Sequence, residues 1–162
     1  MAISKEKKKG IIENIGKIVK DSSSVVFVNF HGLLMNDTTE LRKTLNAKEV
    51  GYTVAKKSLT RKAFAGTKIE GEMPALPGEL ALVYGKDMTA PAREIYAFQK
   101  KFDGKITILG GVFEGKYMDK ESMMSIALIP SLQTLRAQFV NVINSPIQRL
   151  AVALFQIASK KA

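Results

Sequence analysis

The chain has 162 residues, 46% of them hydrophobic, a length and composition that predict a folded domain with its own hydrophobic core. With no cysteine and a single histidine it excludes disulfide scaffolds, thiolate zinc sites, cysteine nucleophiles and histidine-rich metal sites. The formal net charge of +10 predicts a polyanionic partner.

The first twenty residues are rich in lysine and are predicted to form a helix. Apolar residues recur there at spacings of three and four, with lysines on the opposite face and Ser4 as a possible N-cap. No apolar run of signal-peptide length is present, and no apolar run is long enough to cross a bilayer, so we expect a cytoplasmic chain. The apolar positions of this helix are Ile11, Ile12, Ile15, Ile18 and Val19.

Apolar runs alternate with amphipathic segments as far as residue 128. Strands are predicted at residues 25–30, 52–55, 80–84 and, broken or bulged at a Gly-Gly pair, 106–113. Helices are predicted around Leu41 and Leu45 with Asn36 or Asp37 as the cap, from Leu59 to Phe64, and over about 90–102 and 119–128. This alternation predicts an α+β fold, an α/β sandwich in which flanking helices cover a mixed sheet.

The segment after Pro130 has no strand pattern. Its apolar residues follow one another at steps of three or four over about seven helical turns, which predicts a long helix with an apolar stripe. Pro146 interrupts the pattern, so we expect either a kink or two abutting helices with Ser145 capping the second. The apolar stripe consists of Leu132, Leu135, Phe139, Ile143, Ile147, Leu150, Leu154 and Ile157.

Two interpretations of this stripe are open. The helix could fold back on the α/β core, or other chains could bury the stripe, as in helix-in-groove recognition. Its position at the end of the sequence, behind a proline and after the last strand pattern, favours the second interpretation. The sequence is therefore divided into a globular domain, residues 1–130, and a helical tail, residues 131–162.

The positive charge is concentrated in two segments. Residues 1–20 contain six lysines and two glutamates, a net charge of +4, and residues 42–62 contain seven basic residues and one glutamate, a net charge of +6. Clustered cations bind phosphates by releasing counterions. Lys56 and Lys57 are the strongest candidates for a phosphate contact. They follow a strand at the start of a helix, where Ser58 and free helix amides can also bind phosphate. The alternative is a solvated surface without a ligand.

The remaining motifs give no support to catalysis. The glycines between Gly110 and Gly115 lack the spacing of a dinucleotide fingerprint or a Walker loop, which favours a bulge or turn. His31 could stack on a base or donate to a phosphate, but it could equally be an ordinary loop residue. No carboxylate pair or ligand cluster is recognisable, so we predict a protein that is not an enzyme and has neither cofactor nor metal site.

Several short motifs follow one another in a specific order and spacing. They are Ser4-Lys5-Glu6-Lys7, the run from Val25 to Phe30 leading to Gly32-Leu33, Leu41-Arg42, the run from Tyr52 to Leu59, the run from Gly110 to Lys116, Leu128-Ile129-Pro130-Ser131 and the apolar tail. Together they resemble, over essentially the whole length, the bacterial large-subunit ribosomal protein ten family, whose members form the base of the ribosomal stalk.

The chain departs from the family pattern at three places. It has His31 where the family usually has arginine, and a neutral imidazole is a weaker phosphate ligand than a guanidinium group. It has Lys56-Lys57-Ser58 in place of Lys-Asn-Thr, which makes the contact there more electrostatic. The family's Gly-Pro before the third strand is replaced by Gly78-Glu79.

The resemblance implies a structural constituent of the cytoplasmic large ribosomal subunit. Residues 1–130 would bind large-subunit rRNA beside ribosomal protein eleven, and residues 131–162 would anchor dimers of the acidic stalk protein, which recruit translational GTPases. Because Pro146 divides the stripe into two runs, we expect two dimers. The expected stalk-protein-binding residues are those of the apolar stripe, and the expected RNA-binding residues are Lys5, Lys7, Lys8, Lys9, His31, Gly32, Lys56, Lys57, Ser58, Arg61 and Lys62.

Two alternatives remain from the sequence. A ribosome-assembly factor could occupy the same rRNA site, but such a protein would be expected to lack the apolar stripe. A small nucleic-acid-processing enzyme would need a metal-binding carboxylate cluster.

Overall fold

The computed structural model describes residues 5–67, 69–102 and 104–161 and divides into two compact units, with the boundary between Ile129 and Pro130. Ser4, predicted to cap the first helix, lies outside the described residues. The strands are β1 (Ser24–Phe30), β2 (Gly51–Val54), β3 (Ala81–Gly85), β4 (Ile106–Phe113) and β5 (Lys116–Asp119). The helices are α1 (Lys5–Asp21), α2 (Met35–Ala47), α3 (Lys57–Ala65), α4 (Ala90–Lys101), α5 (Lys120–Ala127) and α6 (Leu132–Lys161).

The first unit confirms the predicted α+β class, but its sheet is not mixed. The five strands lie in the order β2-β3-β1-β4-β5, and each named pair of neighbours is antiparallel. The crossover through α2 does leave β1 and β2 running in the same direction. However, β3 lies between them and is antiparallel to both, which the order of the elements along the chain does not reveal.

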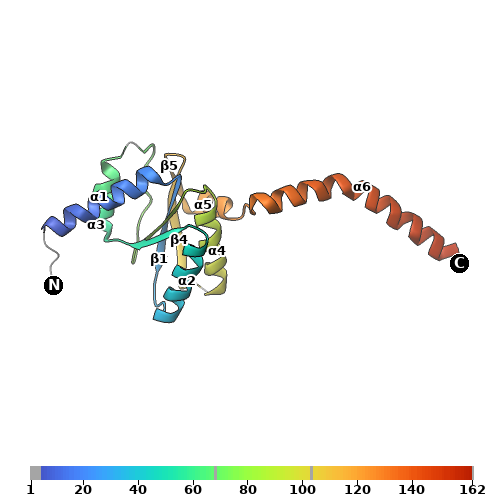
Figure 1. Ribbon diagram of the computed structural model, residues 1–162, viewed down its shortest axis with the longest axis horizontal. Helices are drawn as coiled ribbons and strands as arrows, with labels where there is room; N and C mark the ends of the chain where they lie inside the picture. Colours follow the sequence, from blue (N-terminus) through green and yellow to red (C-terminus); the bar gives the residue numbers. More distant parts are fainter. Residues whose placement is uncertain (1–4, 68, 103, 162) are drawn as a thin grey trace. The chain divides into compact units, whose positions relative to one another are not determined.

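Helices cover both faces of this sheet (Figure 1). Val26 and Val28 of β1 pack into a core with residues of α2, α4 and α5. Val25 and Phe27 point to the opposite face and pack with residues of α1 and α3. A strand with helices on both sides must be apolar at successive positions, which explains the unbroken hydrophobic sequence of β1.

The predicted irregularity at the Gly-Gly pair is a bulge within the single strand β4. Phe27 pairs with Gly110 and Val28 pairs with Ile108, so Leu109 is the extra residue. Gly110 has a φ of 147°, and a Cβ atom there would lie 2.6 Å from the carbonyl oxygen of Met118. Only glycine fits this conformation without displacing β5.

The short strand β5 was not predicted. Its four residues are partly exposed and carry little hydrophobic pattern. The signal that could have found it is the preceding pair Glu114-Gly115, which has φ values of 50° and 77°. Positive φ at both central residues is typical of the type I′ turn that joins two antiparallel strands.

The starts of two helices differ from the sequence prediction. Helix α2 begins at Met35, and Leu34 rather than Asn36 or Asp37 occupies the cap, without a side-chain hydrogen bond. Helix α6 is continuous, so Ser145 does not cap a second helix. Its cap is Ser131, whose Oγ accepts a hydrogen bond of 3.3 Å from the Thr134 amide.

Helix α6 contains Pro146 and bends near its middle (Figure 1). Proline lacks the amide that the preceding turn requires, which accounts for a bend at this point. Among the described helices none is by itself long and apolar enough to cross a membrane, and α5 and α6 meet that test only when counted together across the break between them.

Candidate nucleic-acid and protein interfaces

The first basic segment, in α1, and the α3 part of the second lie on one layer of the first unit, whereas Arg42, Lys43 and Lys48 of the second segment lie at α2, on the opposite layer. Helices α1 and α3 pack against each other, and Ile15, Ala63 and Phe64 from them belong to the same buried cluster. Their outward residues form what we call the basic face. Its exposed members are Lys7, Lys8, Lys9, Lys17 and Lys20 of α1, and Lys56, Ser58, Arg61 and Lys62 at and within α3.

The start of α3 combines side-chain cations with free backbone amides. Lys56 occupies the cap position in an extended conformation, and its carbonyl oxygen accepts hydrogen bonds from the amides of Leu59 and Thr60. For the amides of Lys57 and Ser58, no acceptor is found among the residues that the structure describes. Two free amides beside two lysines form a site suited to an oxyanion.

The end of β1 lies at the same edge of the sheet as the start of α3. Phe30, Lys56 and Lys57 line one open cavity of about 470 Å³. His31 and Gly32 follow directly after Phe30 and are exposed. The His31 amide donates a 3.0 Å hydrogen bond to the carbonyl oxygen of Lys105, and the imidazole has no hydrogen-bond or ion-pair partner among the described residues.

Among the described residues, no acidic side chain forms an ion pair with the cations of α3 and its cap. Within residues 5–67, 69–102 and 104–161, Lys48, Arg93, Lys101 and Lys116 each form an ion pair within 4.0 Å. Lys56, Lys57, Arg61 and Lys62 take part in none of them. Their charges are available to an external ligand.

The second unit presents apolar side chains to solvent. Every residue of the apolar stripe is between 40 and 68% exposed. Exposed valines and a phenylalanine outside the stripe were not predicted, because the 3.6-residue period selects a single face. These additional residues are Val140, Val142, Val152 and Phe155. Apolar surface on this scale marks an interaction site.

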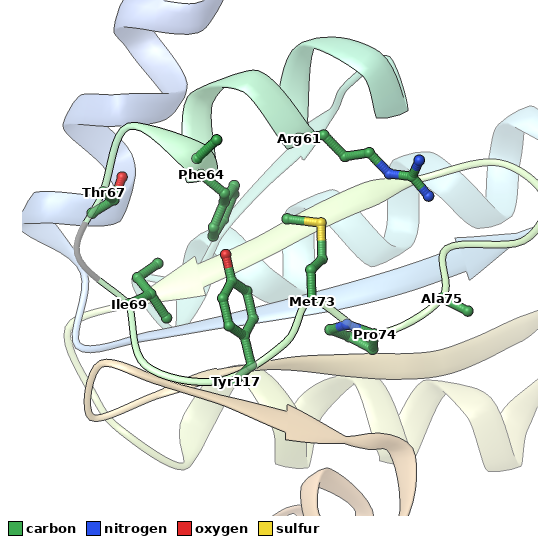
Figure 2. Close-up of a pocket in the computed structure, with 10 residues that line it drawn as sticks. Arg61, Phe64, Thr67, Ile69, Met73, Pro74, Ala75 and Tyr117 are labelled. Carbon is green, nitrogen blue, oxygen red and sulfur yellow. The ribbon is translucent and has the colours of Figure 1, made fainter.

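A second cavity, of about 610 Å³, lies between α3, the loop of residues 66–78 and β5 (Figure 2). Arg61 and Phe64 contribute to it from α3, Met73 and Pro74 from the loop, and Tyr117 from β5. Burial raises the pKa of the Tyr117 hydroxyl above its usual value. The sequence pattern gave no sign of this cavity, because its residues come from three separate segments. Within the described part of the chain, no three acidic or histidine side chains gather to hold a metal ion.

A basic face on one unit and an exposed apolar helix in the other are the surfaces of a protein that binds other macromolecules. Residues 3–100 match the sequence profile of the family described as Ribosomal protein L10. The chain therefore belongs to the ribosomal protein L10 family.

Similarity to individual relatives extends through α6. The chain is 32% identical over 162 residues to the Large ribosomal subunit protein uL10 of Delftia acidovorans, covering 100% of this chain and 92% of that protein. It is 33% identical over 162 residues to that of Bacillus licheniformis, covering 99% and 97%. It is 32% identical over 149 residues to that of Rhodospirillum rubrum, covering 92% and 86%.

Family membership establishes the general function. The chain is a structural, non-enzymatic constituent of the large ribosomal subunit, associated with the ribosome and its rRNA in the bacterial cytoplasm. The enzyme alternative and the assembly-factor alternative raised from the sequence are therefore both set aside.

Proposed function

We propose that the chain binds large-subunit rRNA at the base of the ribosomal stalk through its basic face and anchors dimers of the acidic stalk protein along α6. The observation that carries this proposal is the separation of two chemically opposite surfaces. Lys56, Lys57, Arg61 and Lys62, which have no ion-pair partner among the described residues, lie on the first unit, and the exposed apolar stripe lies in the second. Each surface suits a different class of partner.

The rRNA contact is centred on the start of α3. Lys56 and Lys57 supply charge, and the amides of Lys57 and Ser58 supply directed donors to one phosphate. Arg61 and Lys62 extend the contact along the helix. The remaining proposed contacts are Lys5, Lys7, Lys8 and Lys9 at the start of α1 and His31 and Gly32 after β1.

The stalk-protein contact uses the apolar stripe of α6. Covering about 400 Å² of apolar surface contributes on the order of 10 kcal/mol before the costs of association. The bend at Pro146 divides the stripe into two runs, and we assign one stalk-protein dimer to each run. The dimers would in turn recruit translational GTPases.

The resemblance to the stalk-base family also supports ribosomal protein eleven as a neighbour on the rRNA. We assign no residues to that contact.

The two binding activities can be separated by paired variants of the full chain. Ile143→Asp with Leu150→Asp places two charges on the apolar stripe, and Asn141→Asp with Gln148→Asp places the same charges at two polar positions on the opposite side of the helix. We expect the first variant to lose the acidic stalk protein in native mass spectrometry, and the second to retain it. Both variants should keep wild-type affinity for large-subunit rRNA.

The mass of the wild-type complex also counts the dimers, and we expect two. If the stripe variant forms a complex of wild-type mass, the assignment of the stripe to the stalk protein is wrong. If both variants lose the stalk protein equally, the binding surface is not confined to the stripe.

A further inference from the structure

The cavity between α3, the loop of residues 66–78 and β5 has the volume and the apolar lining needed to bind a planar ring. Its volume of about 610 Å³ falls in the range of ligand pockets, about 300–1,000 Å³. Figure 2 shows the Tyr117 ring between Ile69 and Met73, with Pro74 beside Met73. An aromatic ring, a thioether and a proline ring offer the broad apolar contacts on which a planar group stacks.

Polar groups are also present in this cavity. The Tyr117 hydroxyl has no hydrogen-bond partner among the described residues. A tyrosine hydroxyl is protonated at neutral pH and can donate, and burial raises the pKa of this one further. The Phe64 ring, tilted by 41° with its centroid 6.4 Å from that of Tyr117, holds the tyrosine in place from the side of α3.

The cavity also has a cationic residue, Arg61, which belongs to the basic face. Arg61 lines the cavity, is exposed, and forms no ion pair within the part of the chain that the structure describes. It follows Lys57 by four residues, about 6 Å along the helix axis. A strand whose phosphate contacts Lys57 therefore reaches Arg61 within about two nucleotides, at about 3.4 Å of rise for each.

We propose that this cavity binds one unstacked nucleobase of the large-subunit rRNA, with Tyr117 as its stacking surface and Arg61 as the ligand of its phosphate. The inference rests on the proposed rRNA contact of the basic face and extends it to a defined site. Proteins that read RNA sequence do so mostly on unstacked bases placed against aromatic side chains. The site would thus add base recognition to a surface that otherwise contacts phosphates.

A peptide segment of another protein is the competing occupant, and the charges around the cavity favour RNA. Helix α3 and its cap carry Lys56, Lys57, Arg61 and Lys62 and no acidic residue. Of the nearby acids, Glu70 pairs with Lys116 at 3.3 Å, and Glu72 does not line the cavity.

Two variants test the site in the full chain bound to transcribed large-subunit rRNA. Tyr117→Ala removes the stacking surface, and Ala75→Trp fills the cavity from an exposed lining position without removing a core side chain. The matched control is Ala97→Trp, at an exposed position on α4. The readouts are rRNA affinity as a function of salt and ultraviolet cross-linking followed by mass spectrometry of the linked peptide.

For the wild-type chain we expect a nucleotide cross-linked to the Tyr117 peptide or the Met73 peptide. Both cavity variants should lose this cross-link and bind rRNA about 5- to 100-fold more weakly, the range typical of one stacked base. Their salt dependence should match that of wild type, because no charge has changed. Arg61→Gln should reduce the slope of log affinity against log salt by about one, and Ala97→Trp should change nothing.

The outcomes separate this inference from the proposed function. If both cavity variants bind and cross-link like wild type while Lys56→Ala with Lys57→Ala weakens binding, the nucleobase site is wrong and the rRNA contact stands. If the double lysine variant also binds like wild type, the basic face itself is not the rRNA contact. If Ala75→Trp leaves rRNA binding intact but prevents association with ribosomal protein eleven, the cavity holds a protein, and the nucleobase inference is overturned.

Discussion

The ring of Phe64 stands edge-on against the ring of Phe27, with centroids 5.3 Å apart and an angle of 71° between the planes. Phe27 lies in the central strand β1, and Phe64 lies near the end of α3. Both side chains are fully buried. This contact holds α3 on the sheet through an uncharged residue, so the packing of α3 can be altered without changing the charge of its exposed face.

We expect Phe64→Ala to lower the free energy of unfolding by about 3–5 kcal/mol, because a large buried ring is replaced by a cavity. Urea denaturation followed by tyrosine fluorescence measures this, since all four tyrosines precede residue 130. The matched control is Phe155→Ala in α6, where the ring is 75% exposed. There the change should stay below about 0.5 kcal/mol. Equal losses of stability in both variants would contradict the claim that the buried Phe64 ring stabilises the fold through its contact with Phe27.

The buried carboxylate of Glu94 in α4 forms an ion pair with Lys48, the C-cap residue of α2, whose side chain is 48% exposed; Glu94 Oε2 lies 2.6 Å from Lys48 Nζ, and Glu94 Oε1 lies 3.5 Å from Arg93 Nε. The Glu94 side chain is 7% exposed. We expect Glu94→Gln to lower the free energy of unfolding by about 1–3 kcal/mol. In the exposed pair of Glu40 with Lys101, Glu40→Gln should lower it by about 0–1 kcal/mol. Urea unfolding of the two variants measures both losses. Equal losses would show that the burial of Glu94 does not strengthen its ion pair.

Replacing Lys56 and Lys57 together by alanine should weaken rRNA binding and flatten its salt dependence. Each lost phosphate contact lowers the slope of log affinity against log salt by about 0.7–0.9, so the pair should lower it by about 1.4–1.8. The control is Lys100→Ala with Lys101→Ala on α4, which removes the same charge from the opposite layer. A filter-binding titration across salt concentrations gives both slopes. Equal slopes for the two double variants would show that only net charge matters.

The Tyr52 hydroxyl makes the free energy of unfolding depend on pH in the alkaline range. Burial raises its pKa above the usual value of 10.0, the nearby Arg42 lowers it, and Glu79 raises it. Because the folded state holds this proton more tightly than the unfolded state, its contribution to stability is complete below about pH 10 and is lost as the pH rises through the folded-state pKa. Tyr52→Phe should therefore show a shallower loss of stability above pH 10. Urea midpoints measured from neutral to alkaline pH test this, and identical pH profiles would contradict it.

Pro146→Ala should straighten α6 and stabilise it by up to about 3 kcal/mol, because the new amide can donate to the Val142 carbonyl oxygen. We expect a larger helical circular dichroism signal and a higher melting temperature for that signal. An unaltered helical signal would show that proline does not cause the bend.

Features with a dense local pattern could be predicted from the sequence. The unbroken apolar run of β1 indicated a central strand, and the repeated spacing from Leu132 to Ile157 indicated the long helix. The bulge at Gly110 was also correct, because two adjacent glycines inside a strand pattern mark a distortion. In each case the signal lies within one segment.

Features that depend on distant segments could not be predicted. The antiparallel sheet depends on the insertion of β3 between β1 and β2, which no single segment encodes. The cavity beside Tyr117 depends on α3, the 66–78 loop and β5 meeting in space. The cap of α2 was wrong for another reason, since Asn36 and Asp37 have suitable side chains but the helix had already begun at Met35.

The bulge at Gly110 also limits how the cavity can change. A Cβ atom at this position would lie 2.6 Å from the Met118 carbonyl oxygen and 2.9 Å from the Pro74 ring. A larger residue there must therefore push Pro74 outward, and Pro74 forms part of the cavity wall. A substitution at Gly110 would therefore reshape this cavity from within the sheet, although Gly110 is not among the residues that line the cavity.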